Sequence, residues 1–143
     1  MTDPVHLFAY GTLRAGEPND VRGLAPAPRF VGFGVVEGDL HDFGFHPGIV
    51  LRSGAAPVLG EVWACAPELV ATLDRIELEY PERPGLYRQA WRDVACGGAV
   101  LRCLVYELTD GGASSLGRFP PAPLVDWVGW RIRRAGLAGD RER

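Results

Sequence analysis

The chain has 143 residues, of which 47% are hydrophobic and 23% charged, a composition typical of one globular domain with a single core. Its net charge is −3 and all fifteen basic residues are arginine, so no strongly basic surface points to nucleic acid. No run approaches the roughly eighteen apolar residues that cross a bilayer, and the N-terminus lacks a signal-peptide pattern. We therefore expect residues 1–143 to form a single cytoplasmic domain without membrane contact.

The first informative stretch is an apolar run at residues 5–9 that is followed by Gly11. We expect a strand that leaves its sheet at this glycine. Glycine can serve here in a plain turn, or it can let a ligand approach backbone N–H groups that a Cβ would otherwise cover. The local pattern leaves both interpretations open. Residues 15–20 are rich in turn formers, and residues 21–24 predict a short helix or a loop.

Three strands are predicted in the next part of the chain. Residues 30–40 favour a strand with glycine-marked bulges, and residues 49–51 a short strand at a sheet edge, because Pro47 precedes it. Residues 58–65 are apolar on both parities, which predicts a central strand that is covered on both faces. Glu61 interrupts that pattern; it is either part of a site or, as we favour, a structural carboxylate.

Residues 68–77 carry the period of an amphipathic helix. With Leu69 as the origin and about 100° per residue, Glu77 lies at roughly 80°, along the buried face, whereas Glu68 and Asp74 project toward solvent. Burial raises the pKa of a carboxyl and lets it exchange a proton near neutral pH. A glutamate that turns to water at the frayed helix end fits the same count. The apolar stripe comprises Leu69, Val70, Leu73 and Ile76.

The C-terminal half predicts a hairpin, a loop and a closing helix. Trp127 and Trp130 lie in that last helix, where they can pack on the chain's own core or on a partner. The three cysteines are odd in number, lie in apolar runs and lack metal-ligand spacing, so we expect buried free thiols. The predicted segments are a lid-like loop at 78–85, strands at 86–94 and 100–108, a turn at 96–99, a loop at 109–123, a helix at 124–133 and a frayed end at 141–143.

Several short motifs occur in one order along residues 5–108. They are Phe8-Ala9-Tyr10-Gly11-Thr12-Leu13-Arg14, Gly38-Asp39-Leu40 followed by Pro47, Gly60-Glu61-Val62, Leu73-Asp74-Arg75-Ile76-Glu77, Leu86-Tyr87-Arg88 and Val105-Tyr106. In this order the chain resembles the γ-glutamylcyclotransferase-like superfamily, in particular its AIG2-like branch. The resemblance implies an α+β fold with a small mixed β-barrel-like sheet flanked by a few short helices. Residues 109–143, a loop and a C-terminal helix, match the family poorly.

The resemblance also implies a site. A pocket forms at the loop of Tyr10, Gly11, Thr12 and Leu13, whose backbone N–H groups would hold the α-carboxylate of a small γ-glutamyl substrate. Glu77 is the implied proton-transfer residue. Leu78 follows it where family members often have glycine, and a shifted register would give the role to Glu79, although the helix count places Glu79 on the far side. Further residues that could line the pocket are Arg14, Pro47, Tyr87 and Tyr106.

The implied reaction needs no cofactor and no metal, because the substrate's own α-amino group is the nucleophile that forms 5-oxoproline. The sequence does not select the leaving amine, which could belong to an amino acid, a polyamine-like amine, a protein lysine or an antibiotic precursor. The alternative function is a binding or regulatory module that keeps the pocket without turnover.

Overall fold

A computed structural model describes residues 3–44, 46–79, 85–113 and 126–132 of the chain. Six strands make up most of this part. They are β1 (Val5–Ala9), β2 (Arg29–Asp42), β3 (Pro47–Leu51), β4 (Pro57–Cys65), β5 (Tyr87–Cys96) and β6 (Ala99–Leu108). The helical segments are a 3₁₀ turn, η1 (Val21–Gly23), then α1 (Leu69–Glu77), the short α2 (Asp110–Ala113), and residues 127–132.

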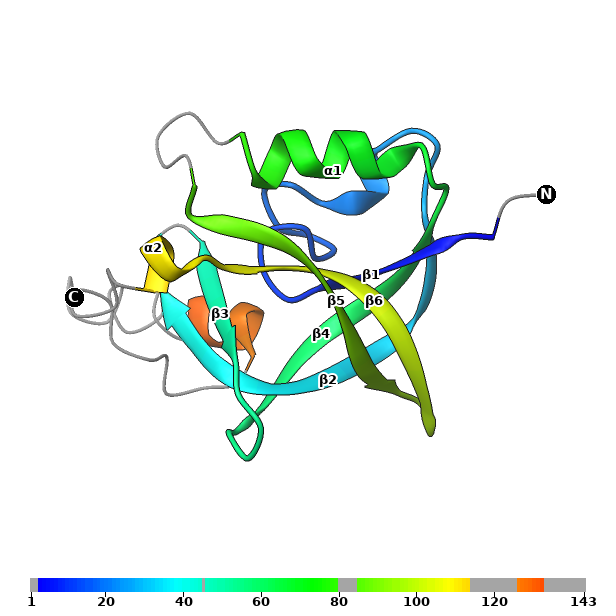
Figure 1. Cartoon of the computed structure of the whole chain (residues 1–143). Coiled ribbons are helices and arrows are strands. Elements are labelled where there is room, and N and C mark those ends of the chain that lie inside the picture. The colour runs from blue at the N-terminus through cyan, green and yellow to red at the C-terminus, as the bar shows by residue number, and fades with distance from the viewer. Residues whose placement is uncertain (1–2, 45, 80–84, 114–125, 133–143) are drawn as a thin grey trace, which may run out of the picture.

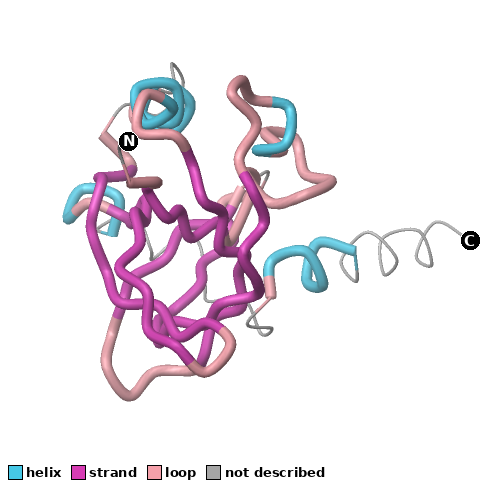
Figure 2. Tube along the Cα trace, turned by 90° about the vertical axis from the view of Figure 1, so that its right-hand side faces the viewer, coloured by secondary structure: helices cyan, strands magenta, loops and turns pink. Residues whose placement is uncertain are grey.

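The strands close into a barrel (Figure 1). Their order is β3-β2-β4-β1-β6-β5, and an additional pairing of β2 with β5 joins the two ends of a five-stranded set, to which β3 is added as an extra strand. β1 and β6 run parallel, and the other pairs are antiparallel. The predicted α+β fold with a mixed barrel-like sheet is thereby confirmed. Figure 2 shows α1 above the strands and the helical residues 127–132 beside them.

Two hydrophobic clusters use the two faces of the barrel wall. On β1, Phe8 points into the barrel, where it packs with Val62 and Trp127. Leu7 and Ala9 point outward and pack under α1 with Leu69 and Leu73. Side chains of a strand alternate between faces, so a strand that is covered on both sides is apolar on both parities. The same reasoning predicted a central β4, which pairs with β1 on one side and β2 on the other.

Most predicted elements occur close to their expected positions. Pro47 is the first residue of the added strand β3, as its missing N–H requires. Gly97 and Gly98 form the β5–β6 turn with φ values of 56° and 81°, the left-handed geometry that tight hairpins need. All three cysteines are buried and free. Residues 110–113 form a helical turn where a loop was expected, and the predictions for 80–84 and 141–143 fall outside the described residues.

Residues 127–132 confirm the described part of the predicted closing helix. Trp127 is fully buried in the barrel cluster and therefore packs on the chain's own core. Trp130 packs against the same cluster, and its indole N–H donates to Asp42 at the end of β2 (2.8 Å). No helix in the described ranges is long and apolar enough to cross a membrane.

Candidate functional site

A cavity of about 190 Å³ opens at the end of the barrel where both hydrophobic clusters meet. The loop after β1 forms one wall, the start of β3 a second, the end of α1 a third, and β5 and β6 the remainder. The lining residues are Phe8, Ala9, Tyr10, Gly11, Thr12, Leu13, Pro18, Asn19, His46, Pro47, Ile76, Glu77, Leu86, Tyr87 and Tyr106. The structure thus brings together the family-derived candidates Tyr10, Gly11, Thr12, Leu13, Pro47, Glu77, Tyr87 and Tyr106; their roles remain predictions.

The loop after β1 is held by its own backbone and by Pro47. The N–H of Arg14 donates to the carbonyl of Gly11 (3.0 Å), which closes a turn, and the N–H of Asn19 donates to the carbonyl of Thr12 (2.9 Å). Gly11 does not have a positive φ. A Cβ at Gly11 would lie 2.5 Å from Cγ of Pro47, so glycine is required because the proline ring packs directly on the backbone.

Glu77 is the one carboxylate among the described residues that line the cavity. Burial raises the pKa of this carboxyl from its ordinary 4.5 to about 7. The residue as a whole keeps intermediate exposure, in line with a side chain whose accessible surface faces a cavity. Within the described part of the chain, no hydrogen-bond donor or cation pairs with it. The carboxyl can therefore exchange a proton near neutral pH.

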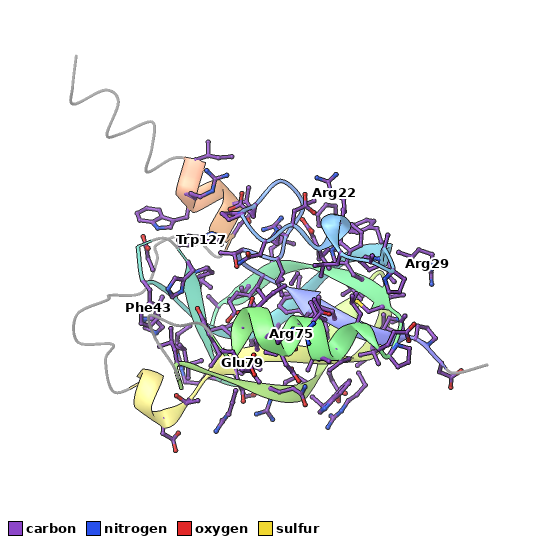
Figure 3. The ribbon with its side chains drawn as sticks, turned by 90° about the horizontal axis from the view of Figure 1, so that it is seen from above. Arg22, Arg29, Phe43, Arg75, Glu79 and Trp127 are labelled. Atoms are coloured by element: carbon purple, nitrogen blue, oxygen red, sulfur yellow. The ribbon has the colours of Figure 1, made fainter. Side chains whose placement is uncertain are left out.

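Glu79 follows the end of α1 by two residues and is exposed (Figure 3). It does not line the cavity, so the shifted register receives no geometric support.

Two tyrosines link the cavity to the barrel and to α1. The hydroxyl of Tyr10 donates to the carbonyl of Tyr106 (2.6 Å), and the hydroxyl of Tyr106 donates to Asp74 Oδ1 (2.7 Å). Burial raises the pKa of both phenols, assisted at Tyr10 by the nearby Glu77 carboxyl and at Tyr106 by the hydrogen bond to Asp74, so both remain neutral donors. The expectation that Asp74 projects toward solvent is met only in part: its exposure is intermediate, and the side-chain amide of Gln89 on β5 also donates to its carboxylate (3.0 Å).

His46 is a cavity residue that the sequence reasoning missed. The hydroxyl of Tyr87 donates to the carbonyl of Pro47, which can only accept, so the Tyr87 oxygen accepts from His46 Nδ1 at 2.7 Å. This hydrogen count assigns a proton to Nδ1. The imidazole also stacks on Phe43 at 5.7 Å with 4° between the rings. Its position next to Pro47 was the one sequence signal available.

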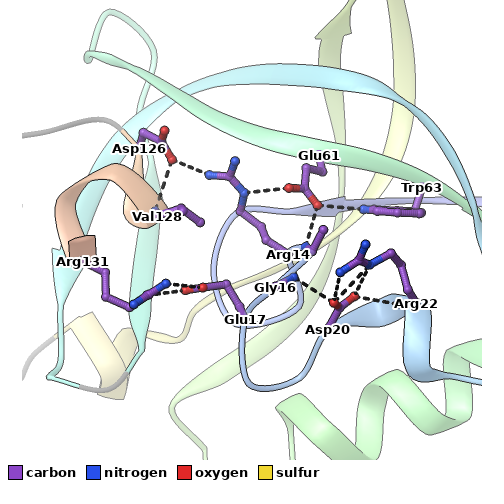
Figure 4. A network of polar contacts seen from close by, with 11 residues as sticks. Arg14, Gly16, Glu17, Asp20, Arg22, Glu61, Trp63, Asp126, Val128 and Arg131 are labelled. Atoms are coloured by element: carbon purple, nitrogen blue, oxygen red, sulfur yellow. Dashed lines mark hydrogen bonds and ion pairs between the residues drawn. The ribbon is translucent and has the colours of Figure 1, made fainter. Parts of the chain in front are cut away.

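Arg14 does not line the cavity, and this corrects the expectation that it could. Its side chain turns away, donates from Nε to Glu61 Oε2 (3.1 Å) and pairs through Nη1 with Asp126 (Figure 4). A guanidinium cannot be buried without anionic partners, and Glu61 and Asp126 lie behind the loop, not in the cavity. Glu61 therefore fits the structural interpretation.

The cavity contains no arginine side chain among its described lining residues. An anionic substrate group would thus be held by backbone N–H groups and neutral donors. Among the described residues, no group of three or more His, Cys, Asp or Glu side chains is placed to hold a metal ion.

Comparisons with known proteins place this geometry in a family. Residues 7–128 match the model of the family described as gamma-glutamyl cyclotransferase, AIG2-like. An AIG2-like protein from Mus musculus is 25% identical over 76% of this chain and 79% of its own, with a TM-score of 0.64. YkqA from Bacillus subtilis is 21% identical over 93% of this chain and 43% of its own, with a TM-score of 0.72.

A structure titled gamma-glutamyl cyclotransferase is 20% identical over 85% of this chain and 73% of its own, with a TM-score of 0.61. No curated protein matches the sequence. The structural likenesses show the shared fold, and the family match extends across the loop after β1, α1 and the barrel. It continues to residue 128, so the expectation that the chain matches the family poorly from residue 109 onward is wrong for residues 109–128. The chain therefore belongs to the AIG2-like family of gamma-glutamyl cyclotransferases.

Proposed function

We propose that the protein releases 5-oxoproline from a γ-glutamyl amine or peptide, with Glu77 as general acid and base. The observation that carries this proposal is a carboxyl that no described residue pairs with, whose pKa burial raises to about 7, in the same cavity as the backbone of residues 10–13. The cavity is smaller than the roughly 300–1,000 Å³ typical of sites for drug-sized ligands, which suits a small acyl group such as glutamyl.

The substrate's α-carboxylate binds the N–H groups of the loop at Gly11, Thr12 and Leu13. This contact and the cavity walls bend the glutamyl chain so that its α-nitrogen lies next to its γ-carbonyl carbon. Such pre-orientation replaces the entropy cost of an encounter, which contributes several kcal/mol in well-oriented intramolecular reactions.

The Glu77 carboxylate then takes one proton from the α-ammonium group. The free amine attacks the γ-carbonyl carbon and forms the C–N bond of the five-membered ring. The bond between that carbon and the leaving nitrogen breaks as the Glu77 carboxylic acid returns its proton to the leaving nitrogen. The ring nitrogen then gives up its second proton through Glu77 to the released amine, which departs as an ammonium ion. The products are 5-oxoproline and an amine, and Glu77 ends in its starting state.

A panel of γ-glutamyl amines and peptides tests the function, with 5-oxoproline measured by chromatography. We expect time-dependent 5-oxoproline from at least one member, in amounts equal to the released amine. If no member reacts and a γ-glutamyl compound still raises the melting temperature, the binding-module alternative replaces the proposal. If no compound reacts or binds, both functions are wrong.

A further inference from the structure

The loop after β1, whose residues 10–13 hold the substrate in the proposed function, is called the substrate loop below. On the side away from the cavity, ion pairs connect it to residues 126–132. Arg14 is 6% exposed, and its guanidinium pairs with Glu61 of β4 and with Asp126. Glu61 in turn accepts from the backbone N–H of Ala15 (2.9 Å) and from the indole N–H of Trp63 (3.1 Å). Figure 4 shows this chain of contacts between the loop, the barrel wall and the start of the C-terminal helix.

A second tie joins the same two segments. Arg131 donates from Nε and Nη2 to the two oxygens of Glu17, at 2.8 and 2.7 Å. The Glu17 side chain is only 2% exposed, and the paired arginine side chain is 38% exposed. Such two-point pairs fix direction as well as distance, because both groups are planar.

The C-terminal segment, residues 126–132, is itself fixed to the barrel. Trp127 is fully buried in the barrel cluster, and Trp130 is bonded to Asp42 of β2. The segment is therefore a rigid support against which the loop can be held. None of its residues lines the cavity.

The tied residues and the cavity residues alternate closely along one loop. Thr12 and Leu13 line the cavity, and Arg14 and Glu17, which follow within five positions, carry the ties. A displacement of about 1 Å in a positioning element can reduce an enzyme's rate about a hundredfold. Buried charged pairs are weak sources of stability compared with apolar packing, but they define one geometry.

We propose that residues 126–132 act as a strap that positions the substrate loop, with Arg14, Glu17, Asp126 and Arg131 as its positioning residues. The strap completes the substrate site without touching substrate. Its consequence for activity rests on the proposed function, whereas its consequence for the loop does not. Loss of the strap should therefore raise KM for a γ-glutamyl substrate more than it lowers kcat.

The experiment compares Arg131→Gln and the double variant Glu17→Met/Arg131→Met with the wild-type chain. The double variant removes both charges, so no unpaired buried carboxylate remains. The matched control is Arg52→Gln, which removes an exposed pair between Arg52, just after β3, and Asp39 of β2. Two readouts are measured. The first is KM and kcat for an active γ-glutamyl substrate. The second is amide hydrogen exchange at Ala15, whose N–H donates to Glu61 of β4, and at Asn19, whose N–H donates to the Thr12 carbonyl within the loop.

We expect both strap variants to raise KM about tenfold and to lower kcat by a smaller factor, because the loop both binds the α-carboxylate and orients the reacting atoms. Amide exchange at Ala15 and Asn19 should become about tenfold faster, while Arg52→Gln changes neither readout. Wild-type exchange rates in both strap variants overturn the strap, whatever the activity. The strap is also overturned if both strap variants keep the wild-type KM, or if Arg52→Gln changes KM and amide exchange as much as the strap variants do. If the wild-type chain makes no 5-oxoproline, the proposed function fails and hydrogen exchange alone decides on the strap.

Discussion

Glu61 and Glu77 are two glutamates on opposite sides of one loop, and their surroundings differ. Glu61 is 6% exposed, is paired with Arg14 and accepts two further hydrogen bonds. Glu77 faces the cavity, and no described residue donates to its carboxyl. An ion pair holds a buried carboxylate in one geometry, whereas burial without a cation raises the pKa of a carboxyl. The same residue type therefore supports the loop at one position and is available for proton transfer at the other.

Glu77→Gln tests the proton-transfer role of Glu77 most directly, because glutamine keeps the size of the side chain but cannot exchange the proton. We expect kcat/KM for 5-oxoproline formation to fall about a thousandfold, within the range of general acid–base catalysis. Circular dichroism should show an unchanged fold. The matched control is Glu79→Gln on the exposed side of the helix end, which should keep full activity. The opposite result for the two variants would transfer the proton-transfer role to Glu79.

Arg14→Met tests the other glutamate. It removes the guanidinium and leaves Glu61 buried without its cation. We expect the free energy of unfolding to fall by about 3 kcal/mol, because an uncompensated buried charge is costly. Urea denaturation measures the change. Arg22→Met, which removes an exposed pair with Asp20, should cost well under about 1 kcal/mol. Equal effects of the two substitutions would show that burial does not distinguish these pairs.

The pH dependence of turnover sharpens the assignment of Glu77. Its carboxylate must be deprotonated to accept the ammonium proton, and its pKa is about 7. We therefore expect kcat/KM to rise about tenfold per pH unit below this pKa and to level off above it. Values of kcat/KM measured from pH 5 to 8 would show this rising part of the pH profile and the plateau that follows it. If kcat/KM instead levels off near pH 4.5, Glu77 is solvated and not buried.

Stability should depend on pH in the opposite direction. The pKa of Glu77 is raised from its ordinary 4.5 to about 7 in the folded chain, so the folded state is most stable relative to the unfolded state below pH 4.5. This stability is lost as the pH rises through 7. The shift corresponds to roughly 3 kcal/mol at most, and partial exposure reduces this to about 2 kcal/mol. The stability gained by Glu77→Gln over wild type should therefore grow by that amount from pH 4 to pH 8 in urea denaturation. A gain that stays constant with pH would contradict the raised pKa.

The contrast between the glutamates also shows what the sequence could predict. The helical period placed Glu77 along the buried face because three-residue and four-residue spacings are local information. The partner of Glu61 was not predictable, since Arg14 lies 47 residues away and Asp126 112 residues from Arg14. The donors to Asp74, Tyr106 and Gln89, were not predictable for the same reason: a helix count contains no information about side chains that come to it from other strands.

Asp74 is held less strongly than the ion-paired Glu61 but, unlike Glu77, it accepts hydrogen bonds. Tyr106→Phe measures how much one of these hydrogen bonds contributes to stability. Its carboxylate accepts from the neutral donors Tyr106 and Gln89, and no described cation pairs with it. A hydrogen bond to a charged group contributes about 1.5–3 kcal/mol, and the partial exposure of Asp74 lets water replace the lost hydroxyl, so we expect a loss of about 1 kcal/mol. Urea denaturation of Tyr106→Phe, with and without Asp74→Asn, gives the coupling between the two residues. A coupling near zero would mean that Asp74 is solvated like an exposed carboxylate. A loss as large as that of Arg14→Met would place Asp74 with Glu61, as a carboxylate whose main role is structural.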